Sequence, residues 1–159
     1  MKKKRILLPV CVLGGLLVLC LGACGLLSWF GSPLLPGSLE RRCAREVSAH
    51  GEELSAFAQT CLETDQVPET LPLPGLVKQV DLWGAPPESF VEFTCDGWGL
   101  GSSTSYYGVH YSPSGPQPFQ GAEAELVPQN GGYAWQGEGD NQGFTRPLGG
   151  DFYYFEAHF

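Results

Sequence analysis

The residues best suited to chemistry are two histidines and a glutamate in two predicted strands. His110 lies in residues 105–112, and Glu156 and His158 lie in residues 151–159, DFYYFEAHF. Alternate side chains of a strand share a face, which groups Tyr154 with Glu156 and His158, and Tyr106 with His110. If the two strands are neighbours, all five side chains converge on one open face of a sheet. Two imidazoles and a carboxylate are a ligand set that zinc accepts.

A binding surface is favoured over an enzyme on this face. The sequence contains no HExxH motif, no GxSxG motif and no glycine-rich phosphate loop. We therefore predict no catalytic residue, no metal ligand and no cofactor. An enzyme is kept as the alternative class of function. The alternative is a surface hydrolase or metal-dependent enzyme that uses His110, Glu156 and His158.

The charge distribution excludes some partners. Four of the nine basic residues lie at positions 2–5, and all seventeen acidic residues lie from Glu40 onward. Nucleic-acid binding requires lysine and arginine to displace counterions from phosphates. Because only five basic residues remain in the acidic body of the chain, we expect no nucleic-acid partner.

The N-terminus predicts membrane attachment. Residues 1–5 are a basic cluster, and residues 6–30 contain no charged side chain. A helix of about 20 apolar residues crosses the hydrocarbon core of a bilayer. The basic cluster should stay cytoplasmic, which sends the C-terminal body across the membrane as a single-pass protein.

The same segment has two alternative interpretations. The stretch LGAC, which ends at Cys24, resembles the lipobox of bacterial lipoproteins and predicts lipidation of Cys24. A cleaved secretory signal is the third reading, with small residues at Gly22 and Ala23. All three place the body outside the cytoplasm, either anchored through a helix, lipid-anchored at the cell surface, or secreted.

Three cysteines lie in the body: Cys43, Cys61 and Cys95. Cys43 and Cys61 are eighteen residues apart on one predicted helix. That spacing corresponds to about 27 Å along the axis, too far for a disulfide. Cys61 with Cys95 is the feasible pair, and buried reduced thiols are the alternative.

The body predicts an α+β domain. Residues 38–64 carry a helical stripe that consists of Cys43, Val47, His50, Leu54, Phe57 and Cys61. Beyond residue 76 the pattern changes to strands, with hairpin signals at Asn130–Gly131 and Gly149–Gly150. One amphipathic helix should pack on a five- to seven-stranded antiparallel sheet. In residues 151–159 the more apolar set should face that helix: Tyr153, Phe155, Ala157 and Phe159.

The predicted organisation is a basic n-region at 1–5, an anchor or lipoprotein signal at 6–30, a linker at 31–37 and an extracytoplasmic domain at 38–159. The expected function is a non-enzymatic interaction module at the cell envelope, with an envelope protein as partner. Its contact surface would be the open sheet face or the proline-rich loop 112–121, which could present Phe119. A structural component of an envelope complex is a further alternative.

Overall fold

The computed structural model describes residues 4–30, 35, 37–68, 73–100 and 103–159. The chain divides into two compact units, Met1–Arg42 and Cys43–Phe159. The first unit contains helix α1 (Lys4–Phe30), and within it Arg41 Nη2 donates a hydrogen bond of 3.1 Å to Ser28 Oγ. Among the described residues, no helix meets the requirements of length and apolarity for crossing a bilayer. The membrane anchor expected at residues 6–30 stays a prediction.

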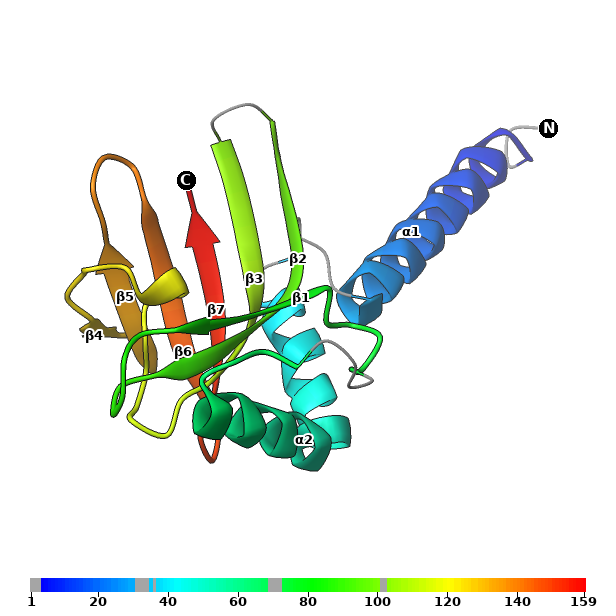
Figure 1. Cartoon of the computed structure of the whole chain (residues 1–159). Coiled ribbons are helices and arrows are strands. Elements are labelled where there is room, and N and C mark those ends of the chain that lie inside the picture. Colours follow the sequence, from blue (N-terminus) through cyan, green and yellow to red (C-terminus); the bar gives the residue numbers. More distant parts are fainter. Residues whose placement is uncertain (1–3, 31–34, 36, 69–72, 101–102) are drawn as a thin grey trace. The chain divides into compact units, whose positions relative to one another are not determined.

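The second unit is built on one antiparallel sheet, which gives the α+β architecture expected from the sequence (Figure 1). The described part of the chain forms seven strands in the order β1-β2-β3-β7-β6-β5-β4. Their bounds are β1 Gln79–Trp83, β2 Phe90–Leu100, β3 Ser103–Tyr111, β4 Val127–Gln129, β5 Gly132–Gln136, β6 Gln142–Gly149 and β7 Phe152–His158. The neighbouring strands β3 and β7, in the middle of the sheet, are separated in sequence by three others.

The turn residues explain the meander from β4 to β7. Asn130 and Gly131 both have positive φ, 47° and 77°, and join β4 to β5. Gly149, which ends β6, and Gly150, which begins the turn to β7, have φ of 124° and 56°. Positive φ values of this kind let a short turn match the twist of the flanking strands, and both predicted hairpins are confirmed.

Helix α2 (Ser38–Thr64) packs on one face of the sheet, which we call the helix face. Its Phe57 ring lies 6.1 Å from the Phe93 ring, and its Gln59 donates a hydrogen bond of 3.1 Å to the Tyr111 hydroxyl. His50 departs from helical geometry (φ −129°, ψ 15°). Its side chain is 42% exposed and lies 3.4 Å from a Glu53 oxygen, so the expectation that His50 belongs to the buried stripe is wrong.

The opposite face, which we call the loop face, is covered by residues 112–126. This connection has to pass from β3 to the far edge of the sheet, where β4 begins. Its 3₁₀ turn η1 (Phe119–Gly121) contributes Phe119 to a buried cluster with Trp135, Phe155 and Ala157. Phe119 is 3% exposed, so the loop does not present that ring to a partner as the sequence suggested.

The two faces of β7 are reversed relative to our expectation. Phe155 and Ala157 pack against Phe119 on the loop face. Phe152 pairs across strands with Tyr111 and Tyr154 with Val109, on the helix face. Both faces of this strand carry buried side chains, because the 112–126 connection covers Phe155 and Ala157 on the side opposite α2.

Candidate functional site

The structure separates the five predicted site residues onto two faces. His110 pairs with Tyr153 and Tyr106 with Ala157, so His110 and Tyr106 lie on the loop face. Glu156 pairs with Tyr107 and His158 with Ser105, which lie on the helix face. The strands β3 and β7 are neighbours, as required, but their register puts His110 on the other side of the sheet from Glu156 and His158.

This separation overturns the proposed zinc set of His110, Glu156 and His158. Side chains on opposite faces of a sheet point away from each other and cannot meet at one ion. No group of three or more histidine, cysteine, aspartate or glutamate side chains suited to a metal is found among the described residues.

Tyr154, Glu156 and His158 do come together, and Ser105 joins them in a continuous polar network. The Tyr154 hydroxyl donates to Glu156 Oε2 at 2.9 Å. Glu156 Oε1 lies 3.2 Å from His158 Nε2, and His158 Nδ1 lies 2.8 Å from Ser105 Oγ. The side chains of His158 and Glu156 are 40% and 35% exposed. The network can therefore offer hydrogen bonds to a molecule that approaches the helix face.

A serine, an imidazole and a carboxylate in series can also move a proton. His158 could accept the Ser105 proton while Glu156 balances the imidazolium charge. Acyl transfer needs in addition preorganised donors for an oxyanion. The backbone N–H of the adjacent Thr104 already donates to Phe159 O at 2.9 Å. This N–H is therefore not free to donate to an oxyanion beside Ser105.

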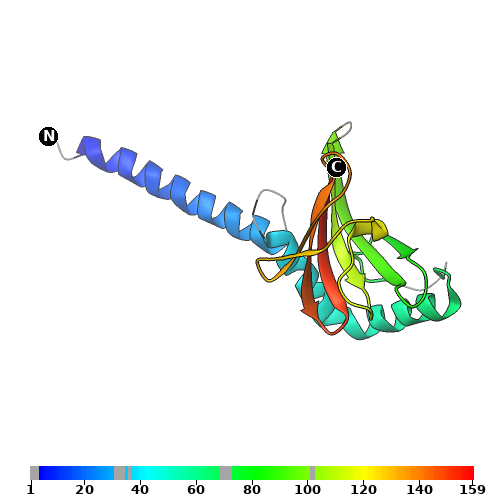
Figure 2. The ribbon, with the colours of Figure 1, turned by 90° about the vertical axis from the view of Figure 1, so that its left-hand side faces the viewer.

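The β2–β3 hairpin places apolar surface beside this network. Trp98 pairs with Ser105, which pairs with His158, so the three form one cross-strand row. Trp98 is 41% exposed and Leu100 is 91% exposed. Figures 1 and 2 both show this hairpin extending beyond the C-terminal end of β7. We call Trp98 and Leu100 the hairpin tip.

The hairpin tip was missed at the level of sequence. Trp98 lies in a glycine-rich stretch, GWGLG, in which alternation of apolar and polar residues breaks down. Gly97 and Gly99 have no side chains, so the alternation of apolar and polar residues does not predict a projecting strand here. Only the structure shows that Trp98 and Leu100, two residues apart in β2, are both exposed.

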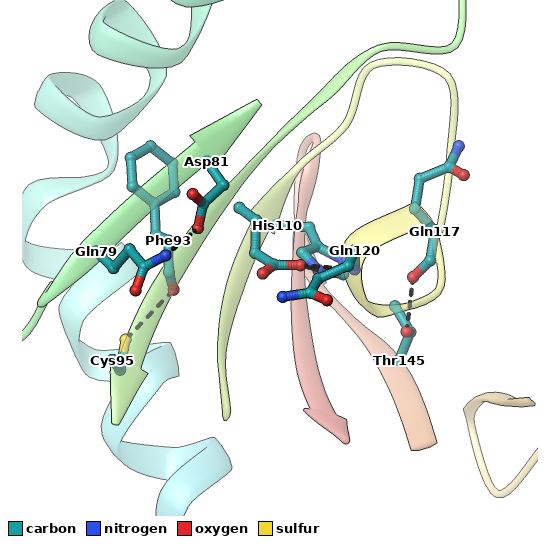
Figure 3. A network of polar contacts seen from close by, with 9 residues as sticks. Gln79, Asp81, Phe93, Cys95, His110, Gln117, Gln120 and Thr145 are labelled. Atoms are coloured by element: carbon teal, nitrogen blue, oxygen red, sulfur yellow. Dashed lines mark hydrogen bonds and ion pairs between the residues drawn. The ribbon is translucent and has the colours of Figure 1, made fainter. Parts of the chain in front are cut away.

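On the loop face, His110 forms a buried pair with Glu92. His110 Nε2 lies 3.0 Å from Glu92 Oε2, and both side chains are fully buried. The backbone N–H of Gln120 donates to the same carboxylate oxygen at 3.0 Å. Figure 3 shows Gln120 of η1 reaching toward His110, with Thr145 bonded to the carbonyl of Gln117 nearby. Through the hydrogen bond from Gln120, the pair therefore holds the connection 112–126 against the sheet.

Two atoms of this pair have no hydrogen-bond partner within the described residues: Glu92 Oε1 and His110 Nδ1. The ring of His110 stacks on Phe155 at 4.4 Å and meets the Phe90 ring edge-on at 4.9 Å. The surroundings are thus aromatic. These contacts give His110 a role in the core, and they close it to a ligand at the surface.

Asp81 continues the same row at the sheet edge, because it pairs with Glu92, which pairs with His110. Burial raises the pKa of the Asp81 carboxyl above its usual value, a hydrogen bond from Gln79 opposes this, and the nearby Glu92 raises it further. An aspartate with a raised folded-state pKa stabilises the fold at low pH and loses that contribution as pH rises through the folded-state pKa.

Asp81→Asn should therefore stabilise the protein at pH 7, by up to about 1 kcal/mol, because the site is partly exposed. The gain should vanish below about pH 4, where the wild-type carboxyl is protonated. Thermal unfolding of both proteins between pH 3 and 8 measures this, with the exposed Asp140→Asn as control. A variant that is less stable than wild type at pH 7 would contradict the assignment.

The cysteines are arranged differently from our expectation. Cys43, Cys61 and Cys95 are all buried thiols in the structure, and the Cys61–Cys95 disulfide stays a prediction. The sulfur that meets Cys95 belongs to Cys43, at a distance of 4.0 Å. Burial raises the pKa of the Cys61 thiol. Cys24, the predicted lipidation site, is an exposed thiol in α1.

Comparisons of the chain with protein-family models, with curated proteins and with solved structures find no match.

Proposed function

We propose that the Cys43–Phe159 unit is a non-enzymatic interaction module, displayed outside the cytoplasm and held at the cell envelope by the N-terminal segment. The observation that carries this proposal is the hairpin tip, where Trp98 and Leu100 are 41% and 91% exposed. Water around exposed apolar side chains is released when a partner covers them. Tryptophan is also among the residue types that contribute most to binding free energy at interfaces.

The polar network supplies the rim that such an apolar contact needs. Ser105 and His158 lie in the same cross-strand row as Trp98, and Glu156 bonds to His158. Partly exposed donors and acceptors around an apolar centre exclude water and fix the orientation of the partner. The unit has few basic and many acidic residues, so the partner surface that fits best is basic.

The membrane attachment is supported by the surface of α1. Its apolar side chains are largely exposed, with Val18 at 69%, Leu19 at 71% and Leu21 at 64%. Apolar surface of this extent is normally covered by lipid or by another protein. Together with the uncharged segment 6–30, this supports a single-pass membrane anchor with the domain extracytoplasmic. Lipidation at Cys24 is the alternative form of attachment.

The test is site-specific photocrosslinking in cells. A photoreactive amino acid replaces Trp98 or Leu100 in the full chain, and a matched probe replaces Val127, which is 51% exposed on the edge strand β4. We expect one protein partner to crosslink from positions 98 and 100 and not from 127. Trp98→Ala, with a probe at 100, should reduce its yield about 30-fold.

Two outcomes of the crosslinking would contradict this proposal. A partner captured equally from position 127 would contradict the hairpin tip as the contact surface. A partner captured only by probes in residues 6–30 would instead indicate a structural component that acts through its anchor. Accessibility of the domain to a protease added outside intact cells tests the localisation separately, since a cytoplasmic domain would be protected.

A further inference from the structure

Two buried thiols of the domain face each other across the interface between α2 and the sheet. Cys43 lies on α2 and Cys95 on β2, fifty-two residues apart in sequence. Their sulfur atoms are 4.0 Å apart, and the residues are 0% and 2% exposed. A disulfide needs the sulfurs at about 2.05 Å, so about 2 Å must be closed. Each sulfur turns on a single χ1 bond, which can close such a gap.

The backbone at Cys95 favours this approach. The β2–β3 register shifts between Thr94 and Asp96, so Cys95 is the extra residue of a β-bulge. Bulges re-aim a side chain and release it from the regular ladder. Cys95 Sγ also lies 3.7 Å from the carbonyl of Phe93, whose ring packs on Phe57 of α2. The bulged cysteine is therefore directed at the helix.

We propose that Cys43 and Cys95 form a disulfide when the domain folds in an oxidising compartment. The two thiols lose two protons and two electrons, one S–S bond forms, and a protein disulfide of the thiol-oxidoreductase class is reduced to its dithiol. The exchange takes place before the core closes, because the folded domain buries both sulfurs. Cys61 has no part in this bond and is left as a buried thiol.

The bond would join α2 to the central sheet. Closing a loop of this length restricts the unfolded chain and stabilises the folded domain. Reduction should lower the melting temperature by about 10 °C. The proposal rests on the extracytoplasmic location proposed above, since cytosolic thiols are kept reduced.

The test is peptide mapping of the full-length protein from cells lysed in N-ethylmaleimide. Cleavage after glutamate places Cys43 in peptide 41–46, Cys61 in 54–63 and Cys95 in 93–123, so each body cysteine is on its own peptide. We expect peptides 41–46 and 93–123 to be linked, and Cys61 to carry the maleimide. Cys61→Ser should retain the link, and Cys43→Ser should leave Cys95 alkylated.

The failures of the two proposals can be told apart by refolding purified, reduced full-length protein in a glutathione redox buffer. Linkage in the buffer but not in cells would keep the Cys43–Cys95 geometry and overturn the extracytoplasmic location. Alkylation of both cysteines in the buffer as well as in cells would overturn the disulfide itself. A link from Cys61 to either residue would also overturn it.

Discussion

Replacing Glu92 by alanine is expected to lower the free energy of unfolding by about 3–5 kcal/mol, because it breaks a fully buried polar pair. Glu92 accepts from Gln120 N–H and lies 3.0 Å from His110 Nε2. Without the carboxylate, the imidazole of His110 is left in an aromatic environment with neither nitrogen bonded. The Gln120 N–H loses its partner as well.

The destabilisation caused by Glu92→Ala should extend to the connection 112–126, which covers the loop face. Gln120 has φ of 55°, in the left-handed region that a non-glycine residue rarely adopts. Its bond to Glu92 helps to hold this conformation, so Glu92→Ala should also loosen η1 and the packing of Phe119. Hydrogen exchange at residues 112–126 should rise more than at β6, where Thr145 and its neighbours bond in the sheet.

A matched double replacement separates the polar pair from the packing. Glu92→Met with His110→Phe removes both partners and keeps similar volumes. Because a buried pair replaced by apolar groups is often neutral or stabilising, the double variant should fall within about 2 kcal/mol of wild type. Urea unfolding followed by tryptophan fluorescence measures all three proteins. A loss below 1 kcal/mol for Glu92→Ala would show that the pair does not hold the loop.

The fold was predictable where local rules determine it. Of the six residues in the predicted stripe of α2, Cys43, Leu54, Phe57 and Cys61 are buried, whereas Val47 and His50 are only partly buried. Asn130–Gly131 and Gly149–Gly150 predicted two hairpins because their positive φ values are a local property of the turn. The predicted five to seven strands are seven in the described part.

The candidate site was only partly predictable, because it depends on long-range pairing. Grouping Tyr154, Glu156 and His158 required only alternation within β7. Adding His110 required the register of β3 against β7, and a shift of one residue exchanges the faces. The same limit applies to Cys95, whose approach to Cys43 depends on a bulge that no residue pattern announces.

Which face of β7 meets α2 was also beyond the sequence. The choice made from apolarity alone assumed that one face is open. The 112–126 connection buries Phe155 and Ala157 under Phe119, so both faces carry apolar side chains. Since that burial follows from the strand order, it could not be inferred from residues 151–159.

Gly108→Ala should be the second strongly destabilising change, by about 2–4 kcal/mol, because it overpacks the centre of the sheet. Gly108 lies on β3 opposite Phe155 of β7. A Cβ at this position would lie 2.9 Å from two ring carbons of Phe155 and would overlap the carbonyl oxygen of Phe93. Neither neighbour can yield easily, because Phe155 is fully buried and the carbonyl belongs to the backbone of β2.

Gly51→Ala is the matched control with the opposite expected sign. Gly51 lies inside α2, and the nearest atoms to an added Cβ, on Phe152 and Val47, are 3.8 Å away. Alanine in a helix interior is more favourable than glycine by about 0.5–1 kcal/mol. Urea unfolding should therefore show that the added methyl group lowers the free energy of unfolding in Gly108→Ala and raises it in Gly51→Ala. Equal effects of the two variants would mean that Gly108 is not in close contact with Phe155, and that the loop face is less tightly packed than the structure shows.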